Sequence, residues 1–460
     1  SSRLGPRSGY ADFALLARMP ALAMVAALGL AAHAVSAQPD RVLSLPGYGA
    51  PKTKHFAGFS NATASGENQL FYYFVEAEIG SNSTETPLLI WLNGGPGASS
   101  MSGLFVEKLG PQIVASGPRL VDNPEHSMKK YHVMAVDNPV GAGYATTTTG
   151  AYAKSEEEVR TQFVHALRGF YKRHPEYSKN PLWVTGESYA GKYVPNIAYE
   201  IATNAKEIPL KGVVIGNGLY NEPTQYASLG EKAFGMGVID EKMLPEVERR
   251  AQKCKDAIAR KMDFAMDFCE NITVRWLYTG PKAVAGELFY YDFGIQNSNA
   301  LDEASDLLGK YLNRADVKAA LHVGNSTTWQ DADETGPVAV ALRGDFLAPS
   351  VPMVVNLLDM GLEVFMYNGV RDGSVCNHIG NLNLLLEMQW KGSGDFAASE
   401  STPWPSADDV MGHIRGAGNL RFATIMRTGH LVPLVVPKQF STLLDIALTP
   451  THRGQSSIIV

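Results

Sequence analysis

The chain has 460 residues, enough to bury a large core in two domains or in one α/β domain with insertions. With 45% hydrophobic and 19% charged residues, the composition is that of a globular protein and excludes an intrinsically disordered chain. The net charge of -6 gives no electrostatic basis for binding nucleic acid or an anionic membrane surface.

The first 37 residues are predicted to be a targeting segment. Residues 20–32 are apolar but too short to cross a bilayer comfortably, and basic residues precede them. Val35-Ser36-Ala37 offers small residues to a signal peptidase, so we expect cleavage after Ala37, with an uncleaved anchor as the alternative. We therefore expect a mature protein without a stable membrane anchor, in the secretory pathway and bound for a vacuole, a lysosome or export. Four glycosylation sequons fit that route, at Asn61, Asn82, Asn271 and Asn325.

Strands alternate with helices along most of the remaining chain. The predicted strands are short and β-prone, and lie at residues 71–77, 87–92, 131–136, 181–185, 211–215, 362–367 and 420–426. Helical spacing is found at residues 156–171 and 192–205. This alternation predicts an α/β fold, with a mostly parallel central sheet flanked by helices on both faces.

Residues 221–335 interrupt this alternation, because they are helical, polar and irregular. We interpret them as a helical cap inserted into one domain that spans residues 38–460. Of the three cysteines, Cys254 and Cys269 lie in this cap and could pair in an oxidising compartment, which leaves Cys376 as a free thiol.

A sharp turn is predicted at Ser188, between the strand at 181–185 and the helix at 192–205. Gly186 and Ala190, two residues before and after the serine, leave room for a strained strand-to-helix turn. Such a turn exposes the serine Oγ beside a helix N-terminus, which favours negative charge. The pattern indicates a nucleophile, and the alternative is a serine that caps a helix.

A serine nucleophile needs a base and an acid that orients the base. Asp372 and His430 follow the strands at 362–367 and 420–426, in the chain order that this architecture requires. The alternative for each is an ordinary turn residue.

The reaction also needs two N–H donors for the oxyanion. The glycine turn after the strand at 87–92 offers one donor, most plausibly Gly95, and Tyr189 after the nucleophile offers the other. A phosphate-binding loop is a poor alternative, because no Gly-Lys-Ser/Thr follows the glycines.

Several motifs together resemble the signature blocks of the serine carboxypeptidases. They run in order from about Leu45 to Pro437 and include Trp91-Leu-Asn-Gly-Gly-Pro-Gly97, Asp137-Asn-Pro-Val-Gly-Ala-Gly143, Gly186-Glu-Ser-Tyr-Ala-Gly191, Ile215-Gly-Asn-Gly-Leu219, Tyr311-Leu-Asn-Arg-Ala-Asp-Val317 and Gly429-His-Leu-Val-Pro433. The resemblance implies an α/β-hydrolase fold with an inserted cap. It also implies a serine-type carboxypeptidase that acts on peptides and proteins with a free C-terminus, without a metal or cofactor.

The resemblance also assigns roles to individual residues. The implied catalytic residues are Ser188, Asp372 and His430, and the implied oxyanion hole is formed by Gly95 and Tyr189. The residues implied to bind the substrate's terminal carboxylate are Asn93, Glu107 and Glu187.

The two glutamates suggest a dependence on pH. Two neighbouring carboxyls cannot both ionise cheaply, so one keeps a proton at mildly acidic pH and can donate a hydrogen bond to a substrate carboxylate. As the pH rises, both ionise and repel the substrate. We therefore expect hydrolysis to be best at acidic pH and to weaken through KM.

The chain departs from the family pattern at a few positions. Ala98 and Ala332 stand where the family usually has a cysteine pair, and Lys108 is one extra residue beside Glu107. Two other functions stay open: an acyltransferase or esterase on the same scaffold, and a non-catalytic binding or protective protein. A homodimer is also left open.

Overall fold

The computed structural model describes residues 38–262, 264–279, 282–331 and 336–450. The chain divides into two units at residue 41, and the large unit begins at Val42. The predicted targeting segment, residues 1–37, and Ala332 lie outside the described residues. Within the described residues, no helix has the length and apolar character needed to cross a membrane.

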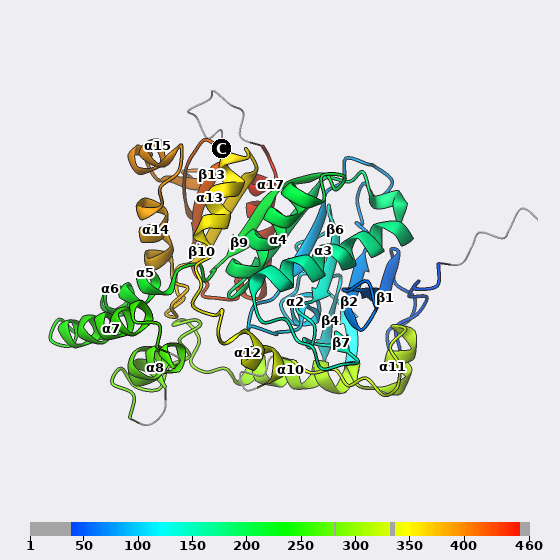
Figure 1. Cartoon of the computed structure of the whole chain (residues 1–460), viewed down its shortest axis with the longest axis horizontal. Helices are drawn as coiled ribbons and strands as arrows, with labels where there is room; N and C mark the ends of the chain where they lie inside the picture. The colour runs from blue at the N-terminus through cyan, green and yellow to red at the C-terminus, as the bar shows by residue number, and fades with distance from the viewer. Residues whose placement is uncertain (1–37, 263, 280–281, 332–335, 451–460) are drawn as a thin grey trace, which may run out of the picture. The chain divides into compact units, whose positions relative to one another are not determined.

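One large mixed sheet forms the centre of this unit (Figure 1). Its strands, in spatial order, are β1 (His55–Asn61), β2 (Asn68–Val75), β6 (His132–Asp137), β3 (Leu88–Leu92), β8 (Leu182–Glu187), β9 (Leu210–Gly216), β10 (Glu363–Gly369), β13 (Leu420–Ile425), β12 (Val410–Ala417) and β11 (Thr402–Pro405). The short β7 (Thr146–Thr147) pairs with β2, and β4 (Gln112–Ala115) pairs with β5 (Arg119–Asp122) in a separate hairpin.

The six central strands, from β6 to β13, are parallel to one another. The predicted parallel sheet is thus confirmed at the centre. Both edges are antiparallel, since β1 and β2 form a hairpin at one edge and β11 and β12 return along the other. Parallel strands run in the same direction, so the turns after β3, β8, β9, β10 and β13 all lie at the carboxyl ends of the strands, along the same end of the sheet.

The pleat of the strands divides the core into two layers. In β3, for example, Leu88, Ile90 and Leu92 face one layer, while Leu89 and Trp91 face the other. All five side chains are buried, as expected for a strand that is covered on both faces.

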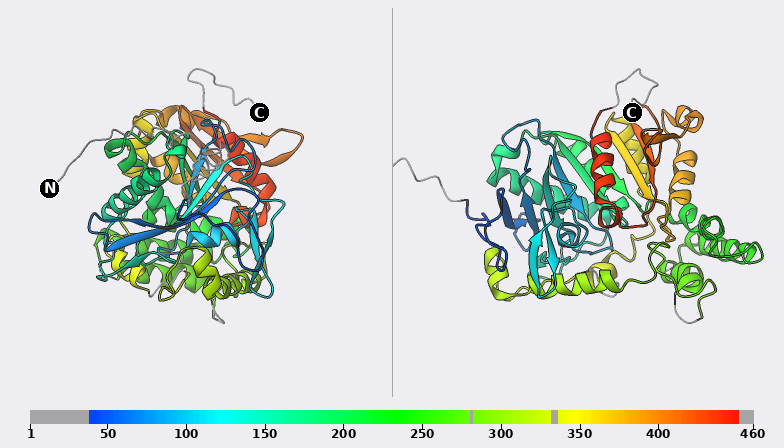
Figure 2. Two further views of the ribbon diagram at one scale, coloured as in Figure 1. Left: turned by 90° about the vertical axis from the view of Figure 1, so that its right-hand side faces the viewer. Right: turned by 180° about the vertical axis from the view of Figure 1, so that it is seen from behind.

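Helices cover both faces of the sheet (Figure 2). The layer with Leu88 is closed by α3 (Glu156–Arg173), η1 (Pro175–Tyr177), α4 (Ala190–Asn204), α12 (Pro337–Leu342), α13 (Val351–Asp359), α14 (His378–Glu387) and α15 (Ser393–Ala398). The layer with Trp91 is closed by α2 (Ser100–Phe105), α10 (Asn299–Leu312), α11 (Ala315–Ala320), α16 (Val432–Val435) and α17 (Pro437–Ala447).

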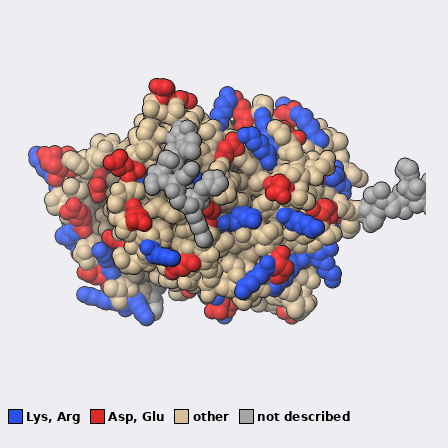
Figure 3. Space-filling view, turned by 90° about the horizontal axis from the view of Figure 1, so that it is seen from above, with Lys and Arg blue, Asp and Glu red and all other residues tan. Residues whose placement is uncertain are grey.

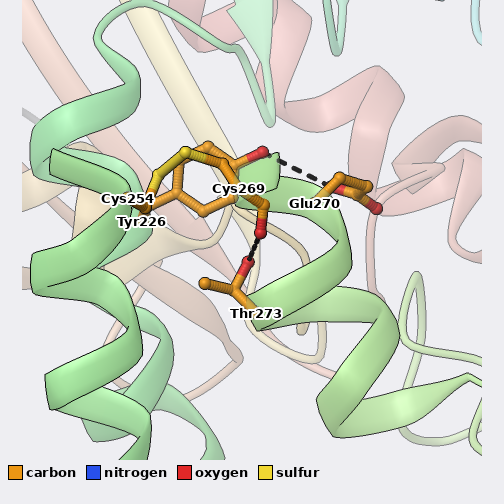
Figure 4. The surroundings of a disulfide bond; sticks show 5 residues. All are labelled: Tyr226, Cys254, Cys269, Glu270 and Thr273. Atoms are coloured by element: carbon orange, nitrogen blue, oxygen red, sulfur yellow. Dashed lines mark hydrogen bonds between the residues drawn. A yellow bond between two sulfur atoms is a disulfide. The ribbon is translucent and has the colours of Figure 1, made fainter. Parts of the chain in front are cut away.

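A third, smaller hydrophobic cluster lies within the predicted cap. It is formed by α5 (Glu222–Ala227), α6 (Leu229–Gly235), α7 (Leu244–Ala259), α8 (Ala265–Glu270), the π-helix η2 (Asn271–Arg275) and α9 (Trp276–Tyr278). A disulfide between Cys254 of α7 and Cys269 of α8 fixes this cluster, which confirms that the two cysteines pair (Figure 4). Cys376 is a buried free thiol. By contrast, α10 and α11 share a core with the sheet, so only the first half of the predicted cap has a core of its own.

Candidate active site

Ser188 lies in the turn between β8 and α4, and its backbone is strained. Its φ is 62°, in the left-handed region that residues with side chains seldom adopt. The backbone N–H of Ser188 donates to the carbonyl of Gly216 at 3.1 Å. The carbonyl of Ser188 accepts from the N–H groups of Gly191 and Leu219, each at 2.9 Å. These three hydrogen bonds hold the strained turn against the end of β9.

The residues around Ser188 must be small because neighbouring atoms leave no room for larger side chains. A Cβ atom at Gly186 would lie 2.4 Å from the carbonyl oxygen of Leu92 and 2.8 Å from the Cβ of Ala190. Position 186 therefore accepts only glycine, because backbone blocks one side. Ala190 fits because the position facing it has no side chain.

Asp372 and His430 form a buried pair at the carboxyl end of the sheet, where Ser188 also lies, directly after β8. Nδ1 of His430 lies 2.7 Å from Oδ2 of Asp372, and the side chains are 4% and 0% exposed. Asp372 follows β10 and His430 follows β13, and these strands are parallel neighbours. The sequence predicts both residues from their positions, and the register of the two strands brings them together.

The carboxylate of Asp372 is fully hydrogen-bonded. Oδ2 also accepts from Nδ2 of Asn217 at 2.7 Å, and Oδ1 accepts from the N–H of Ser374 at 2.8 Å. Burial favours a higher pKa for Asp372, but the charge and hydrogen bond of His430, together with the hydrogen bonds of Ser374, hold that pKa below its usual range. Sequence reasoning missed Asn217, although an asparagine between two glycines directly after β9 was the available signal.

The segment after α9 holds the turn that carries His430. The carbonyl of Tyr291 accepts from the backbone N–H of His430 at 2.7 Å, and the centroids of the two rings are 4.7 Å apart. Oδ2 of Asp292 accepts from the N–H of Gly429 at 2.9 Å. Sequence reasoning missed Tyr291 and Asp292, since nothing in the irregular stretch around them indicates which strand end they meet.

The glycine turn after β3 lies directly against the Ser188 turn. A Cβ atom at Gly94 would lie 2.4 Å from the backbone nitrogen of Tyr189 and 2.7 Å from the Cβ of Ser188. Gly95 has a φ of +104°, which a residue with a side chain rarely adopts. The backbone of this turn therefore lies beside both Tyr189 and the serine side chain.

Asn93 joins two buried carboxyl groups next to the serine. Its Nδ2 donates to Oε1 of Glu107 at 2.7 Å and to Oε1 of Glu187 at 3.3 Å. Nε1 of Trp91 donates to Oδ1 of Asn93 at 2.9 Å, which fixes the amide. Asn93, Glu107 and Glu187 are 6%, 3% and 2% exposed. The three residues that the resemblance groups together are thus in contact.

Both glutamates hold their protons to unusually high pH. Burial raises the pKa of Glu107 to about 7, although the neighbouring carboxyl of Glu187 and the hydrogen bond from Asn93 limit the rise. Burial also raises the pKa of Glu187 well above its usual range, and the charges of Glu107 and Asp372 add to that rise. Oε1 of each glutamate accepts from the same Asn93 amide, and a proton kept on one carboxyl avoids two adjacent buried negative charges. The charge of His430 acts on Glu107 and the charge of Asp372 acts on Glu187, so the two groups of residues lie within electrostatic range of each other.

The backbone around Glu107 is held by hydrogen bonds of its own. The N–H of Glu107 donates to the carbonyl of Ser102 at 3.0 Å, beyond the end of α2. Lys108 has a φ of 64°, and its carbonyl accepts from Nδ2 of Asn123 at 3.0 Å. The chain thus turns sharply after Glu107 while Glu107 itself stays fixed to α2.

Cys376 lies near this site, and its free thiol is buried. Burial raises the pKa of its thiol well above the usual range, and the charge of Asp372 adds to the effect. The thiol therefore stays protonated, and only the thiolate is strongly nucleophilic.

The described residues show neither a metal centre nor a strongly charged binding surface on the face in view. Nowhere in the described parts of the chain do three or more His, Cys, Asp or Glu residues gather in a way that could hold a metal ion. On the face seen in Figure 3, positive and negative side chains are interspersed and do not form a stripe of one sign.

Comparisons with known proteins agree with this geometry. A family model described as serine carboxypeptidase matches residues 46–449. A probable serine carboxypeptidase of Homo sapiens, CPVL, is 32% identical over 413 residues, which cover 87% of this chain and 84% of the human protein. Serine carboxypeptidase-like 48 of Arabidopsis thaliana is 30% identical over 87% of this chain and 80% of its own length.

The fold is also similar to a solved structure. The prohormone-processing carboxypeptidase Kex1(delta)p from Saccharomyces cerevisiae matches with a TM-score of 0.76 at 25% identity. The match covers 86% of this chain and 91% of that chain.

Proposed function

Because the chain belongs to the serine carboxypeptidase family, we propose that it releases C-terminal residues from peptides and proteins at acidic pH, through an acyl-enzyme on Ser188. In this proposal Ser188 is the nucleophile, His430 the general base and acid, and Asp372 the group that orients His430.

The first half of the reaction forms an ester. Oγ of Ser188 attacks the carbonyl carbon of the last peptide bond while His430 takes the hydroxyl proton. The oxyanion that forms accepts hydrogen bonds from the backbone N–H groups of Gly95 and Tyr189. His430 then gives its proton to the leaving nitrogen, the peptide bond breaks, and the C-terminal amino acid departs.

The second half restores the enzyme. Water attacks the ester carbonyl while His430 takes one of its protons, and the same two N–H groups stabilise the second oxyanion. The ester bond then breaks, His430 returns the proton to Oγ of Ser188, and the shortened peptide leaves with a new terminal carboxylate. Asp372 stabilises the imidazolium of His430 in both halves.

One observation supports a preference for chain ends: an asparagine amide and two carboxyl groups with raised pKa values are buried beside the nucleophile. A protonated carboxyl of Glu107 or Glu187 can donate a hydrogen bond to a substrate carboxylate without any basic residue, and Asn93 can add a second by exchanging its longer, 3.3 Å hydrogen bond to Glu187 for one to the substrate. An internal peptide bond brings no carboxylate to this position, so only the last residue of a chain is held in place.

The same two carboxyl groups set the pH range in which the substrate carboxylate binds. The pKa of Glu107 is raised to about 7, so its proton is held below that pH and lost above it. Once the pair carries a negative charge, it repels the substrate carboxylate. Binding therefore weakens as the pH rises through neutral, which appears as a higher KM.

This site and the Cys254–Cys269 disulfide suit an acidic, oxidising compartment. We therefore propose the secretory route, ending in a vacuole, a lysosome or the cell exterior.

The proposal is tested by digesting a peptide mixture at several pH values and reading the C-terminal losses by mass spectrometry. We expect single residues to be lost from free C-termini at acidic pH, and no loss from the same peptides with amidated ends. The Ser188→Ala variant should be inactive on both. Cleavage at internal bonds, or full activity of Ser188→Ala, would contradict the proposal.

A further inference from the structure

A short strap, residues 329–331, is fastened to the N-terminus of α2. Nε1 of Trp329 donates to Oγ of Ser99, the N-cap of α2, at 2.9 Å. Asp331 contacts α2 at two points: Oδ1 accepts from the N–H of Ser99 at 3.4 Å, and Oδ2 accepts from Oγ of Ser102 at 3.0 Å. The strap therefore holds the first turn of the helix, where backbone N–H groups lack partners within the helix.

The other end of this helix carries the group that we propose binds the substrate carboxylate. The helix spans only six residues, all of them buried, and the carbonyl of Ser102 accepts from the backbone N–H groups of Val106 and Glu107. One residue, Ser102, thus contacts Asp331 through its side chain and Glu107 through its backbone. A displacement at the strap reaches Glu107 within this single short helix.

Asp331 also acts on Glu107 through its charge. Burial has the largest effect on the pKa of Glu107, and the neighbouring groups Glu187 on β8 and Asn93 lower it. The charges of Asp331 on the strap and His430 after β13 act on it in opposite directions. The negative charge of Asp331 makes ionisation of Glu107 harder. It has the same effect on Asp137, a buried carboxyl at the end of β6 that accepts from Ser99 and Ser100 at the start of α2.

We propose that Asp331 is a positioning residue for recognition of the substrate's terminal carboxylate: it fixes α2 through Ser99 and Ser102, and its charge extends carboxylate binding toward neutral pH. This inference rests on the proposed role of Glu107. Asp331 itself does not touch the substrate. Its contribution is to the placement and protonation of the group that does.

The test uses the full-length enzyme and one peptide sequence with either a free or an amidated C-terminus. For Asp331→Asn, which keeps the shape and removes the charge, we expect the pH at which KM rises to fall by about half to one pH unit. For Asp331→Ala, we expect an additional rise in KM of about fivefold at pH 5 with little change in kcat, because the hydrogen bonds to α2 are lost.

Ser102→Ala keeps the test valid if Asp331→Ala fails to fold. It should reproduce part of the KM effect, and adding Asp331→Ala to it should cost less than the two single effects combined, since both remove the same hydrogen bond. Asp359→Ala, at an exposed carboxyl of α13, is the matched control and should change nothing.

Each result has a definite reading. The inference is overturned if the Asp331 variants keep the wild-type KM and pH profile while Glu107→Gln changes them. It is also overturned if they lower kcat on the free peptide and leave KM unchanged, because that marks general damage to the active site and not a defect in carboxylate binding. If Glu107→Gln also leaves the preference for free over amidated ends intact, the proposed carboxylate site itself is wrong.

Discussion

The pair of buried glutamates gives a prediction that separates substrate recognition from catalysis. In Glu107→Gln, an amide replaces the carboxyl whose pKa is raised to about 7. The amide can donate a hydrogen bond at every pH, whereas the glutamate donates only while it is protonated. The variant should therefore bind a substrate carboxylate with little dependence on pH, whereas the wild type should bind it more weakly as the pH rises.

The size of the difference follows from the pKa. If productive binding needs protonated Glu107, KM grows by the factor 1 + 10^(pH − 7), which is about tenfold at pH 8 and corresponds to about 1.4 kcal/mol. The sign is fixed by the direction of the shift: the protonated form is present below the raised pKa and is lost as the pH rises through it. For Glu107→Gln we expect KM to change by less than about twofold between pH 5 and pH 8.

The assay is steady-state release of one amino acid from a peptide, with kcat and KM measured separately at each pH. Glu85→Gln, at an exposed carboxyl, is the control and should follow the wild type. A KM that rises in Glu107→Gln as steeply as in the wild type would refute the reasoning, because the titrating group would then lie elsewhere.

Three further predictions concern the residues at the carboxyl end of the sheet and the core around them. Asp372→Asn should lower kcat by about 10⁴-fold with the protein still folded, because an amide in place of the carboxylate no longer fixes the imidazole of the base. Gly186→Ala should destabilise the protein by about 1–3 kcal/mol or prevent folding, since the new methyl group would meet the carbonyl of Leu92 and the Cβ of Ala190, and thermal unfolding measures the loss. The Tm should be several degrees higher at pH 5 than at pH 8, because burial raises the pKa of Glu156 to about 8 and that of Asp137 to about 7, so the folded state holds protons that the unfolded chain releases.

Controls and contrary outcomes differ between these three. Gly235→Ala places a methyl group where nothing lies within 4 Å, so it should be neutral or slightly stabilising, and equal damage from both glycine variants would contradict the contact argument. Glu156→Gln should reduce the difference in Tm between pH 5 and pH 8. An unchanged difference would show that Glu156 does not contribute to the pH dependence of stability. A kcat for Asp372→Asn within tenfold of the wild type would contradict the role of Asp372.

The sequence was sufficient to predict the central strands and the serine turn, because each depends on local pattern. The apolar run before Gly186, the small residues around Ser188 and the helical spacing after Lys192 lie within one short stretch. The turns carrying Asp372 and His430 were found in the same way, since each directly follows a predicted strand.

The sequence did not predict the groups that surround those side chains. Asn217, which donates to Asp372, comes from the end of β9, and Tyr291, which accepts from the backbone of His430, comes from the cap. Of the antiparallel strands at the sides of the sheet, β2 was predicted but β1, β11 and β12 were missed, as was the strap that contacts α2 through Asp331. These contacts join residues far apart in the chain, and no local pattern records them.

The sequence by itself determined which side chains are candidates for the proposed chemistry and in what order they follow the strands, because turn residues and hydrophobic spacing are local properties of the chain. Only the tertiary structure decided their electrostatics. Glu107 and Glu187 are ordinary acids in the sequence, and their pKa values are raised because folding buries both beside Asn93, where neither can be solvated. The fold thus converts two carboxyls into a donor for a third carboxylate, which is the basis of the proposed recognition of chain ends.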